Sequence, residues 1–342
     1  MLTVQRHRRI DVPSILKAMP IKEPSFQDRL AGGLVGLLVG DALGVPYEFR
    51  TAADIPSAAE IEFVPPIGFA RSHNGVPPGT WSDDGAHALC LLASLLEKNC
   101  LDIQDLGDRL VQWYDHGYMA VDGLVFDVGV STGKAIRAMR SGIPAARAGS
   151  ADQYDNGNGA LMRVLPLALW HHGSDADLVA DAHAQSLPTH AHLRSQVCCA
   201  LYCLWARRVL SNADDAWGDA VQTIRHIYAS MPDALEELEW SVRPDAAPEG
   251  GGSGYVVDCL RSARLVQAAG NYEDVVRAAI QLGNDTDTTA CVAGGIAGLR
   301  EGIQSIPNRW RDSLRGQDLY QALLAKLLER GVTQGSPDIS RP

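Results

Sequence analysis

An apolar, glycine-rich run over residues 30–45 limits what this chain can fold into more than any other segment. Its one charged residue is Asp41. Within the part expected to be helical, glycines recur at about one helical turn, at Gly32, Gly33, Gly36 and Gly40. A helical glycine costs about 1 kcal/mol relative to alanine, so this spacing predicts a face on which a second helix packs closely. The run is short for a membrane span, and we expect a buried helix over residues 26–43.

Helical periodicity dominates the rest of the chain, and alternating β patterns are scarce and short. Further helices are expected near residues 84–98, 103–116, 131–141, 160–171, 175–186, 191–211, 214–230, 255–269, 272–282, 288–302 and 316–330. Five prolines predict an ordered loop over residues 51–80, and a glycine-rich turn ends a variable-looking segment over 231–254. The expected fold is all-α, a single compact orthogonal helical bundle over residues 25–332. A basic arm (1–24) precedes it and a tail (333–342) follows it.

Charge and cysteine content exclude several classes of protein. The net charge of -11 argues against sequence-independent nucleic-acid binding, which needs a basic surface. The seven cysteines contain no CxxC pair, so they indicate reduced core thiols and neither a zinc site nor a disulfide framework. No apolar segment of a secretory signal follows the basic start. We therefore expect a cytoplasmic protein that binds neither nucleic acid nor membrane.

Two acidic clusters each directly precede an apolar helix. One is Ser82-Asp83-Asp84, and the other is Asp285-Thr286-Asp287-Thr288. Carboxylates and hydroxyls are ligands for hard cations such as Mg²⁺, Mn²⁺ or Ca²⁺. Four carboxylates brought together would need positive charge, which two divalent cations would supply. For either cluster alone, capping of the following helix is the more frequent role of such residues.

Two familiar loop motifs are excluded. The second cluster lacks the glutamate that an EF-hand carries at its twelfth position. The segment from Gly129 to Ala135 is similar to a phosphate-binding loop, but it has three residues between its glycines and Ala135 in place of the magnesium-binding hydroxyl. An ATPase is therefore not supported.

The order of motifs resembles that of the ADP-ribosylglycohydrolase family from about residue 28 to residue 310. The motifs are Gly36-x-x-x-Gly40-Asp41-Ala42-Leu43-Gly44-x-Pro46-x-Glu48, Ser82-Asp83-Asp84, Asp127-x-Gly129, Gly157-Asn158-Gly159-Ala160-x-Met162-Arg163, Thr189-His190 and Gly283-Asn284-Asp285-Thr286-Asp287-Thr288. Each is weak alone, and their order makes the resemblance specific. Ser82 replaces the usual threonine and keeps the hydroxyl, whereas Gly85 replaces a second threonine.

The resemblance implies the family's helical fold, a two-metal site for magnesium or manganese, and a bound ADP-ribose. The metal ligands it implies are Ser82, Asp83, Asp84, Asp285, Asp287 and Thr288. The residues it implies for holding ADP-ribose are Asp127, Gly129, Asn156, Gly157, Asn158, Gly159 and His190. Glu48 matches a family glutamate beside the metals.

The reaction implied is hydrolysis of the bond between ribose and a protein side chain. It needs an activated water and a carboxylate base; Glu48 is our candidate, with Asp83 and Asp84 as rivals. A structural role is the alternative at each position, and it is the expectation for Arg163 as an ion-pair partner and for His87 as a core residue.

The implied substrate is an ADP-ribosylated protein, with ADP-ribosyl-arginine favoured over serine-linked or small ADP-ribosyl compounds. A module that binds ADP-ribose or a protein without catalysis is the second hypothesis, and a generic helical phosphatase is the third. Residues 5–10 of the arm could insert into an acidic partner such as an ADP-ribosyltransferase and make the protein an antidote, as in immunity proteins; a frayed terminus is the alternative.

Overall fold

The computed structural model describes residues 23–332, and within that range it has fourteen α-helices and no β-strand. Three isolated backbone bridges join Thr51 with Gly283, Ser150 with His190, and Gly157 with Tyr255. The all-α prediction is confirmed. Apart from residues 23 and 24, the predicted basic arm lies outside the described residues, as does the tail at 333–342.

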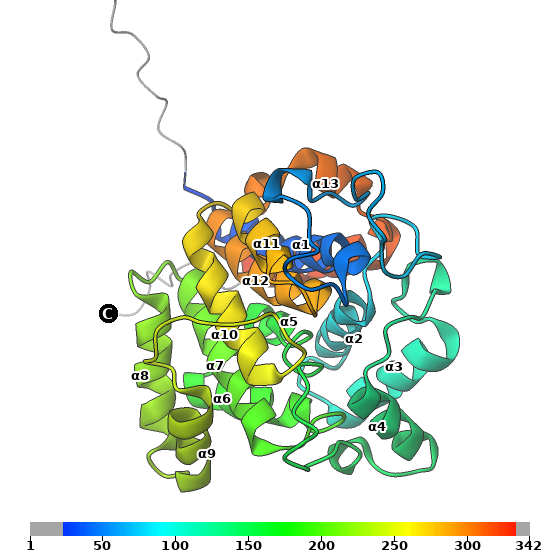
Figure 1. Cartoon of the computed structure of the whole chain (residues 1–342). Coiled ribbons are helices and arrows are strands. Elements are labelled where there is room, and N and C mark those ends of the chain that lie inside the picture. The colour runs from blue at the N-terminus through cyan, green and yellow to red at the C-terminus, as the bar shows by residue number, and fades with distance from the viewer. Residues whose placement is uncertain (1–22, 333–342) are drawn as a thin grey trace, which may run out of the picture.

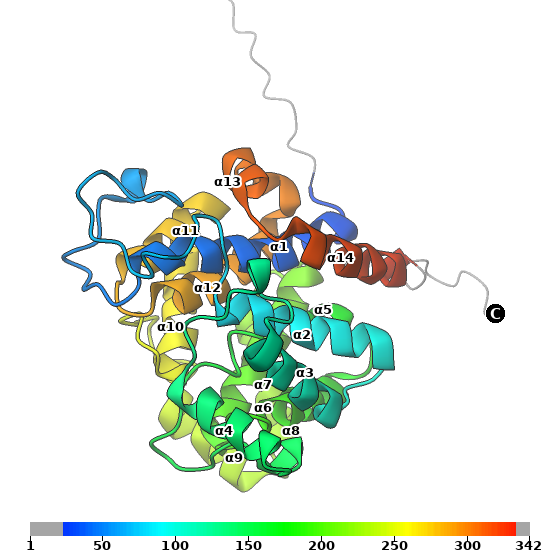
Figure 2. The same cartoon turned by 90° about the vertical axis from the view of Figure 1, so that its right-hand side faces the viewer.

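Helices α1 (Phe26–Gly44) and α12 (Thr286–Glu301) form the centre of the molecule and run antiparallel in direct contact (Figures 1 and 2). Glycines line the seam between them. A Cβ atom at Gly36 would lie 2.7 Å from the carbonyl oxygen of Gly294, and one at Gly40 would lie 2.2 Å from that of Ala290. The glycine spacing therefore brings two backbones together along the whole of α1.

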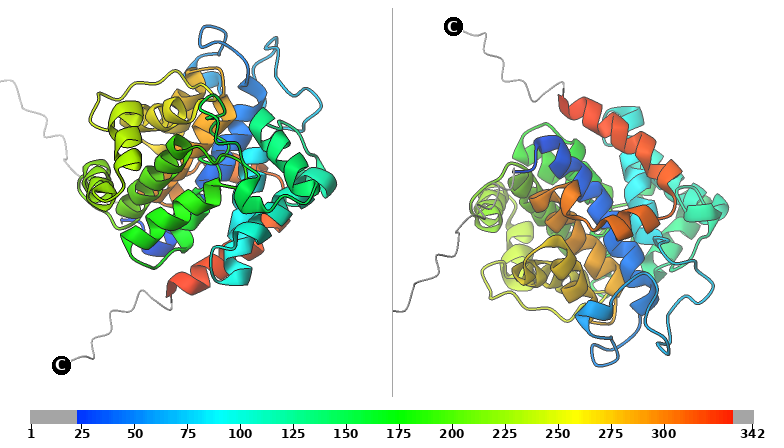
Figure 3. Two further views of the ribbon diagram at one scale, coloured as in Figure 1. Left: turned by 90° about the horizontal axis from the view of Figure 1, so that it is seen from below. Right: turned by 90° about the horizontal axis from the view of Figure 1, so that it is seen from above.

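The remaining helices pack at varied angles, some against this central pair and others against the helices that cover it (Figure 3). They are α2 (Asp83–Lys98), α3 (Ile103–His116), α4 (Val130–Arg140), α5 (Leu165–Trp170), α6 (Asp175–Ser186), α7 (Leu193–Leu210), α8 (Ala216–Tyr228), α9 (Pro232–Glu236), α10 (Val256–Val266), α11 (Tyr272–Gln281), α13 (Asn308–Ser313) and α14 (Gln317–Val332). A six-residue π-helix, Glu237–Val242, follows α9.

Three segments differ from the prediction. Residues 160–164 form a turn, so α5 begins only at Leu165, with Pro166 in the first turn, where proline is tolerated. Helix α9 lies in the segment that was expected to be variable, and α13 was not expected at all. At five and six residues, both are too short to show a helical period.

The proline-rich loop 51–80 is anchored to the helices at several points. The Tyr47 hydroxyl donates a hydrogen bond of 2.8 Å to the Glu62 carbonyl, and the Trp310 indole donates one of 2.6 Å to the Glu62 carboxylate. The backbone N–H of Ser72 donates to the Pro46 carbonyl at 2.9 Å. The loop is thus held against the C-terminal end of α1, beside Glu48.

Burial also decides two questions raised by composition. In the described part of the chain, one stretch, Phe26–Tyr47, is long and apolar enough to cross a membrane, and it is enclosed by the other helices as a core helix is. Six of the seven cysteines are buried, Cys100 is exposed, and all seven are free thiols.

Candidate active site

The first acidic cluster is anchored to α1 by Asp41. This buried carboxylate accepts hydrogen bonds from the backbone N–H of Ser82 (2.9 and 3.1 Å to its two oxygens) and from that of Gly85 (2.7 Å). Burial raises the pKa of Asp41 to about 7, and the N–H donors of Ser82 and Gly85 oppose that rise. Asp41 therefore caps α2 from a neighbouring helix and fixes the cluster that contains Asp83 and Asp84.

The second cluster begins α12, but its aspartates do more than cap that helix. Asp285 stands at the N-cap position without a side-chain capping bond, and its carboxylate instead accepts a hydrogen bond of 2.8 Å from the Asn158 amide. Asp287 accepts the backbone N–H of Thr288 at 2.8 Å. The hydroxyl of Thr286 donates to the Gly44 carbonyl at 2.8 Å and ties the cluster to the end of α1. Ser82 caps α2 by accepting from the N–H of Asp84, and its hydroxyl also donates to the Asp84 carboxylate at 3.2 Å. Capping does not account for Asp285.

The two clusters meet although they are 204 residues apart in sequence. The Thr288 hydroxyl lies 3.3 Å from Oδ2 of Asp84 and donates to it. Within residues 23–332, three buried carboxylate oxygens have no hydrogen-bond partner: Oδ1 of Asp83, Oδ1 of Asp84 and Oδ2 of Asp287. Burial, followed by the neighbouring carboxylates, raises the pKa of all three side chains well above the usual range. Unpartnered oxygens in such a group fit a divalent cation, because a cation would both ligate and neutralise them.

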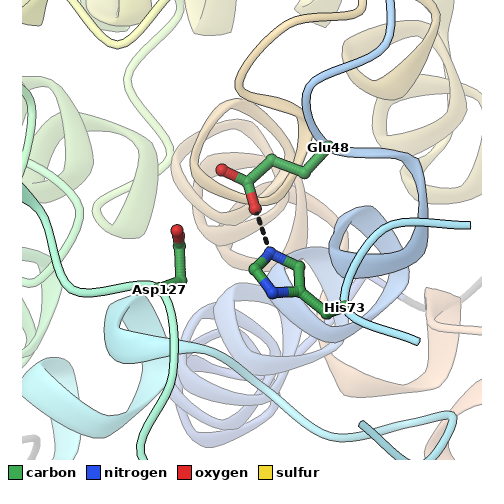
Figure 4. Close-up of side chains that lie close together, drawn as sticks. All are labelled: Glu48, His73 and Asp127. Atoms are coloured by element: carbon green, nitrogen blue, oxygen red, sulfur yellow. Dashed lines mark hydrogen bonds and ion pairs between the residues drawn. The ribbon is translucent and has the colours of Figure 1, made fainter. Parts of the chain in front are cut away.

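Glu48 belongs to two groups of possible metal ligands, one with Asp285 and Asp287 and one with His73 and Asp127; Figure 4 shows the second group. Its Oε2 is 2.6 Å from Nε2 of His73, and the ligand atoms of Glu48, His73 and Asp127 lie within 4.8 Å of one another. The same holds for Glu48, Asp285 and Asp287. Burial raises the pKa of Glu48 to about 10, with Asp127 and Asp285 adding to it, and burial raises that of Asp127 to about 6.

A cavity of about 370 Å³ opens in front of these carboxylates. Ten of the residues predicted for the site line it: Glu48, Asp83, Asp127, Gly129, Gly157, Asn158, Gly159, His190, Asp285 and Thr288. Three others, Ser82, Asp84 and Asp287, are buried behind that lining. The first turn of α4, within the excluded phosphate-loop match, also contributes to the wall.

Gly157 and Gly159 pack against the imidazole of His190. A Cβ atom at Gly159 would lie 2.8 Å from Cε1 of His190, so glycine is required there. Asp127 adopts a left-handed backbone conformation (φ 53°) that aims its side chain at the cavity beside Glu48. This wall of the cavity contains the Asp127 carboxylate, the Asn158 amide, and the backbone of two glycines, which a ligand can approach closely.

Asn156 does not join the residues around the cavity. Its side-chain amide donates to the Gln153 carbonyl at 2.9 Å, and its side-chain oxygen accepts from the Ser195 hydroxyl at 3.0 Å. Both ends of the side chain are therefore used in holding the loop. Its neighbour Asn158 is the residue of this pair that faces the cavity.

The contacts of Arg163 and His87 indicate structural roles. Arg163 is fully buried and donates to neutral acceptors, so the expected ion pair is replaced by hydrogen bonds to Gln185, Gly159 and Thr189. His87 is buried in edge contact with Trp113, with ring centroids 4.3 Å apart, in agreement with its expected place in the core.

Sequence reasoning assigned no role to Asp41 or His73. Asp41 belongs to a motif used for the resemblance, and it is the one charged residue of the apolar run 30–45, which was a signal for it. His73 lies in the proline-rich loop and has no such signal, because only the folded loop brings it to Glu48.

These features define a class, an all-helical protein whose clustered acidic residues are candidate metal ligands at the base of a polar cavity. The family model for ADP-ribosylglycohydrolase matches residues 22–337. ADP-ribosylarginine hydrolase Tri1 of Serratia proteamaculans is 30% identical over 313 residues, which cover 90% of this chain and 81% of that protein. ADP-ribosyl-[dinitrogen reductase] glycohydrolase of Rhodospirillum rubrum is 28% identical over 298 residues, 85% of this chain and 92% of that protein.

A solved structure described as an ADP-ribosylglycohydrolase-related protein complex superposes with a TM-score of 0.71 and 31% identity, covering 89% of this chain and 98% of that one. The chain belongs to the ADP-ribosylglycohydrolase family. It is thus a metal-dependent hydrolase of glycosidic bonds to ADP-ribose, and its carboxylate groups are the candidate metal ligands.

Proposed function

We propose that the protein hydrolyses the N-glycosidic bond between ADP-ribose and an arginine side chain of a modified protein. Two Mg²⁺ or Mn²⁺ ions would bind at the acidic cage, the group formed by Asp83, Asp84, Asp285 and Asp287. The observation that supports this most directly is the set of unpartnered, buried oxygens of Asp83, Asp84 and Asp287 behind a cavity. A module that only binds ADP-ribose would not need these carboxylates, which raise the free energy of the folded protein unless cations neutralise them.

The linkage proposed follows from the charge of the cavity wall and from the relatives. Glu48, Asp127 and Asp285 all present carboxylates to the cavity, and a guanidinium leaving group carries the opposite charge. The similar proteins from Serratia and Rhodospirillum are named for arginine and for dinitrogen reductase respectively. An uncharged serine-linked substrate would gain nothing from this wall.

In the proposed reaction, the side chains of this protein position the substrate and move one proton. The Asn158 turn and His190 hold ADP-ribose, and Asp127 orients the leaving group. When bound, the cations supply the positive charge that polarises a water and the ribose hydroxyls. Glu48 is the general base: it takes a proton from the water whose oxygen bonds to C1″ of the ribose as the C1″–N bond breaks, and the proton then passes to the departing guanidine nitrogen.

The substrate and the metal are tested together by offering arginine-linked and serine-linked ADP-ribosylated proteins to the enzyme, each with Mg²⁺, with Mn²⁺ and with chelator. We expect release of ADP-ribose from the arginine-linked protein alone, and none in chelator. Preference for serine-linked protein would contradict the linkage, and release that ignores the chelator would contradict the metal centre. Tight binding of ADP-ribose without any release would favour the binding module.

Glu48→Gln is expected to lower kcat by about 10² to 10⁴, the usual contribution of a general base, with little change in KM. Glutamine keeps the size of the side chain and cannot accept the proton. Glu60→Gln is the matched control, since Glu60 is an exposed residue that caps the short helix Ala58–Glu60 near the same loop. A Glu48→Gln enzyme with full kcat would move the role of base to Asp83 or Asp84.

We also propose that the protein acts in the cytoplasm, and that its basic arm binds an ADP-ribosyltransferase, which would make it an antidote or immunity protein. The name ADP-ribosylarginine hydrolase Tri1 among its relatives is compatible with this. The comparison to make is the affinity of a co-expressed transferase for the full chain and for a variant without residues 1–24. Equal affinity would end the idea of a binding arm and would leave the hydrolase proposal untouched.

A further inference from the structure

A chain of hydrogen bonds runs from the buried Arg163 to the His190 ring at the cavity. Nη1 of Arg163 donates to the Gly159 carbonyl at 2.9 Å and to the Thr189 hydroxyl oxygen at 2.7 Å. Nε and Nη2 of Arg163 donate to the side chain and the carbonyl of Gln185. The Thr189 hydroxyl oxygen is in turn 2.9 Å from Nδ1 of His190. One guanidinium therefore holds the glycine turn and the residue beside His190.

The direction of these bonds is fixed by counting hydrogens. A guanidinium has donors only, so Arg163 must donate to Thr189. A hydroxyl has one hydrogen to give, and Nδ1 of His190 is the acceptor within reach of it. If Nδ1 carried a proton instead, the hydroxyl would accept from both sides and its own hydrogen would be buried without an acceptor, which is unfavourable. Nδ1 is therefore the acceptor.

The His190 proton then lies on Nε2, the ring nitrogen beside the cavity. His190 lines the cavity, and a Cβ atom at Gly157 would lie 3.3 Å from Nε2. Burial lowers the pKa of His190 to about 3, with the Arg163 charge adding to the effect, so the ring is neutral and has a single N–H. Nε2 makes no hydrogen bond to the described residues, and His190 lines the cavity, so this N–H is available to a ligand.

We propose that Arg163 and Thr189 are positioning residues that hold His190 in its Nε2–H tautomer, so that the ring donates one hydrogen bond to an acceptor oxygen of a ligand in the cavity. With the proposed function, on which the identity of the ligand rests, that oxygen belongs to the phosphates or sugars of ADP-ribose. Neither positioning residue lines the cavity, and both act through the tautomer of His190.

The tautomer is measured directly by two-bond ¹H–¹⁵N correlation spectra of the histidine-labelled protein, with the His190 signal assigned by its loss in His190→Phe. We expect the Nε2–H pattern in the wild type. Thr189→Val removes the hydroxyl and keeps the shape of the side chain, and it should move the ¹⁵N resonance of Nδ1, because the donor to that nitrogen is lost. Thr189→Ser should restore the wild-type pattern. Ser186→Ala is the matched control, because the Ser186 hydroxyl donates to the carbonyl of His190 and not to its ring.

Binding supplies the second measurement. The affinity of Thr189→Val for ADP-ribose should fall about tenfold, which corresponds to about 1.4 kcal/mol, while Thr189→Ser and Ser186→Ala bind as the wild type does. An Nδ1–H pattern in the wild type, or an unchanged pattern in Thr189→Val, would overturn the inference. If the valine variant does not fold, the wild-type spectrum still decides. A wild type that shows the expected tautomer but binds no ADP-ribose would instead defeat the proposed function.

Discussion

Asp287→Asn is expected to abolish hydrolysis and, at the same time, to make the metal-free protein more stable. Asp287 is fully buried, and one of its oxygens has no partner. As a cation ligand it supports several kcal/mol of transition-state stabilisation. Because each 1.36 kcal/mol is a factor of ten in rate, the loss of activity should be roughly 10³-fold or more.

The gain in stability follows from the sign of the pKa shift. Burial, then the neighbouring carboxylates Glu48, Asp127 and Asp84, raises the pKa of Asp287 well above its value of 3.8 in the unfolded chain. Between these two pKa values the folded protein binds a proton that the unfolded chain has released. The free energy of unfolding of the metal-free protein therefore falls as the pH rises above about 4. An asparagine has no charge to bury, so the variant should lose part of this pH dependence.

Thermal unfolding with and without Mg²⁺ separates the two effects. The wild type should gain about 2.7 kcal/mol at a Mg²⁺ concentration 100 times its dissociation constant, whereas Asp287→Asn should gain little. Asp274→Asn is the matched control, an exposed aspartate in the first turn of α11. A variant that is less stable than the wild type in chelator, yet still stabilised by Mg²⁺, would show that Asp287 is a structural residue and no metal ligand.

The helical content of the fold could be predicted because it is encoded locally. Long amphipathic periods and the capping residues before them predicted most helices within a few residues. The glycine spacing in α1 predicted a close helix contact, but it did not identify the partner. That partner, α12, is about 250 residues away in the chain, and no local pattern encodes such a pairing. Helices α9 and α13 were missed for a different reason, because five or six residues are too few to show a helical period.

The sequence predicted those residues of the candidate site that lie within recognisable motifs, and it did not predict the others. Residue types suggested cation ligands at Asp83, Asp84, Asp285 and Asp287, and the family resemblance supplied the idea that the two clusters face each other. A motif also does not say which of two nearby asparagines faces the cavity. Asn158 does, whereas the side chain of Asn156 holds the loop. Contacts made by loop folding, such as His73 with Glu48, have no sequence signal.

The seam between α1 and α12 is the part of the fold on which the site depends, and Gly298→Ala is expected to open it. A Cβ atom at Gly298 would lie 2.0 Å from the carbonyl oxygen of Gly32, a backbone atom that cannot turn aside. Alanine normally stabilises a helix by about 1 kcal/mol relative to glycine. Here the overlap should reverse the sign and lower the free energy of unfolding by about 3 kcal/mol or more.

Gly133→Ala is the matched control for Gly298→Ala, since Gly133 lies inside α4, where an added Cβ would meet atoms no closer than 3.4 Å. We expect denaturant unfolding to show a small gain for Gly133→Ala and a large loss for Gly298→Ala. The seam ends at the acidic cage, where the Thr286 hydroxyl bonds to the Gly44 carbonyl, so the variant that remains folded should also bind Mg²⁺ more weakly. Unchanged stability of Gly298→Ala would mean that the two backbones do not touch, and the meeting of Asp84 with Thr288 would then lose its support.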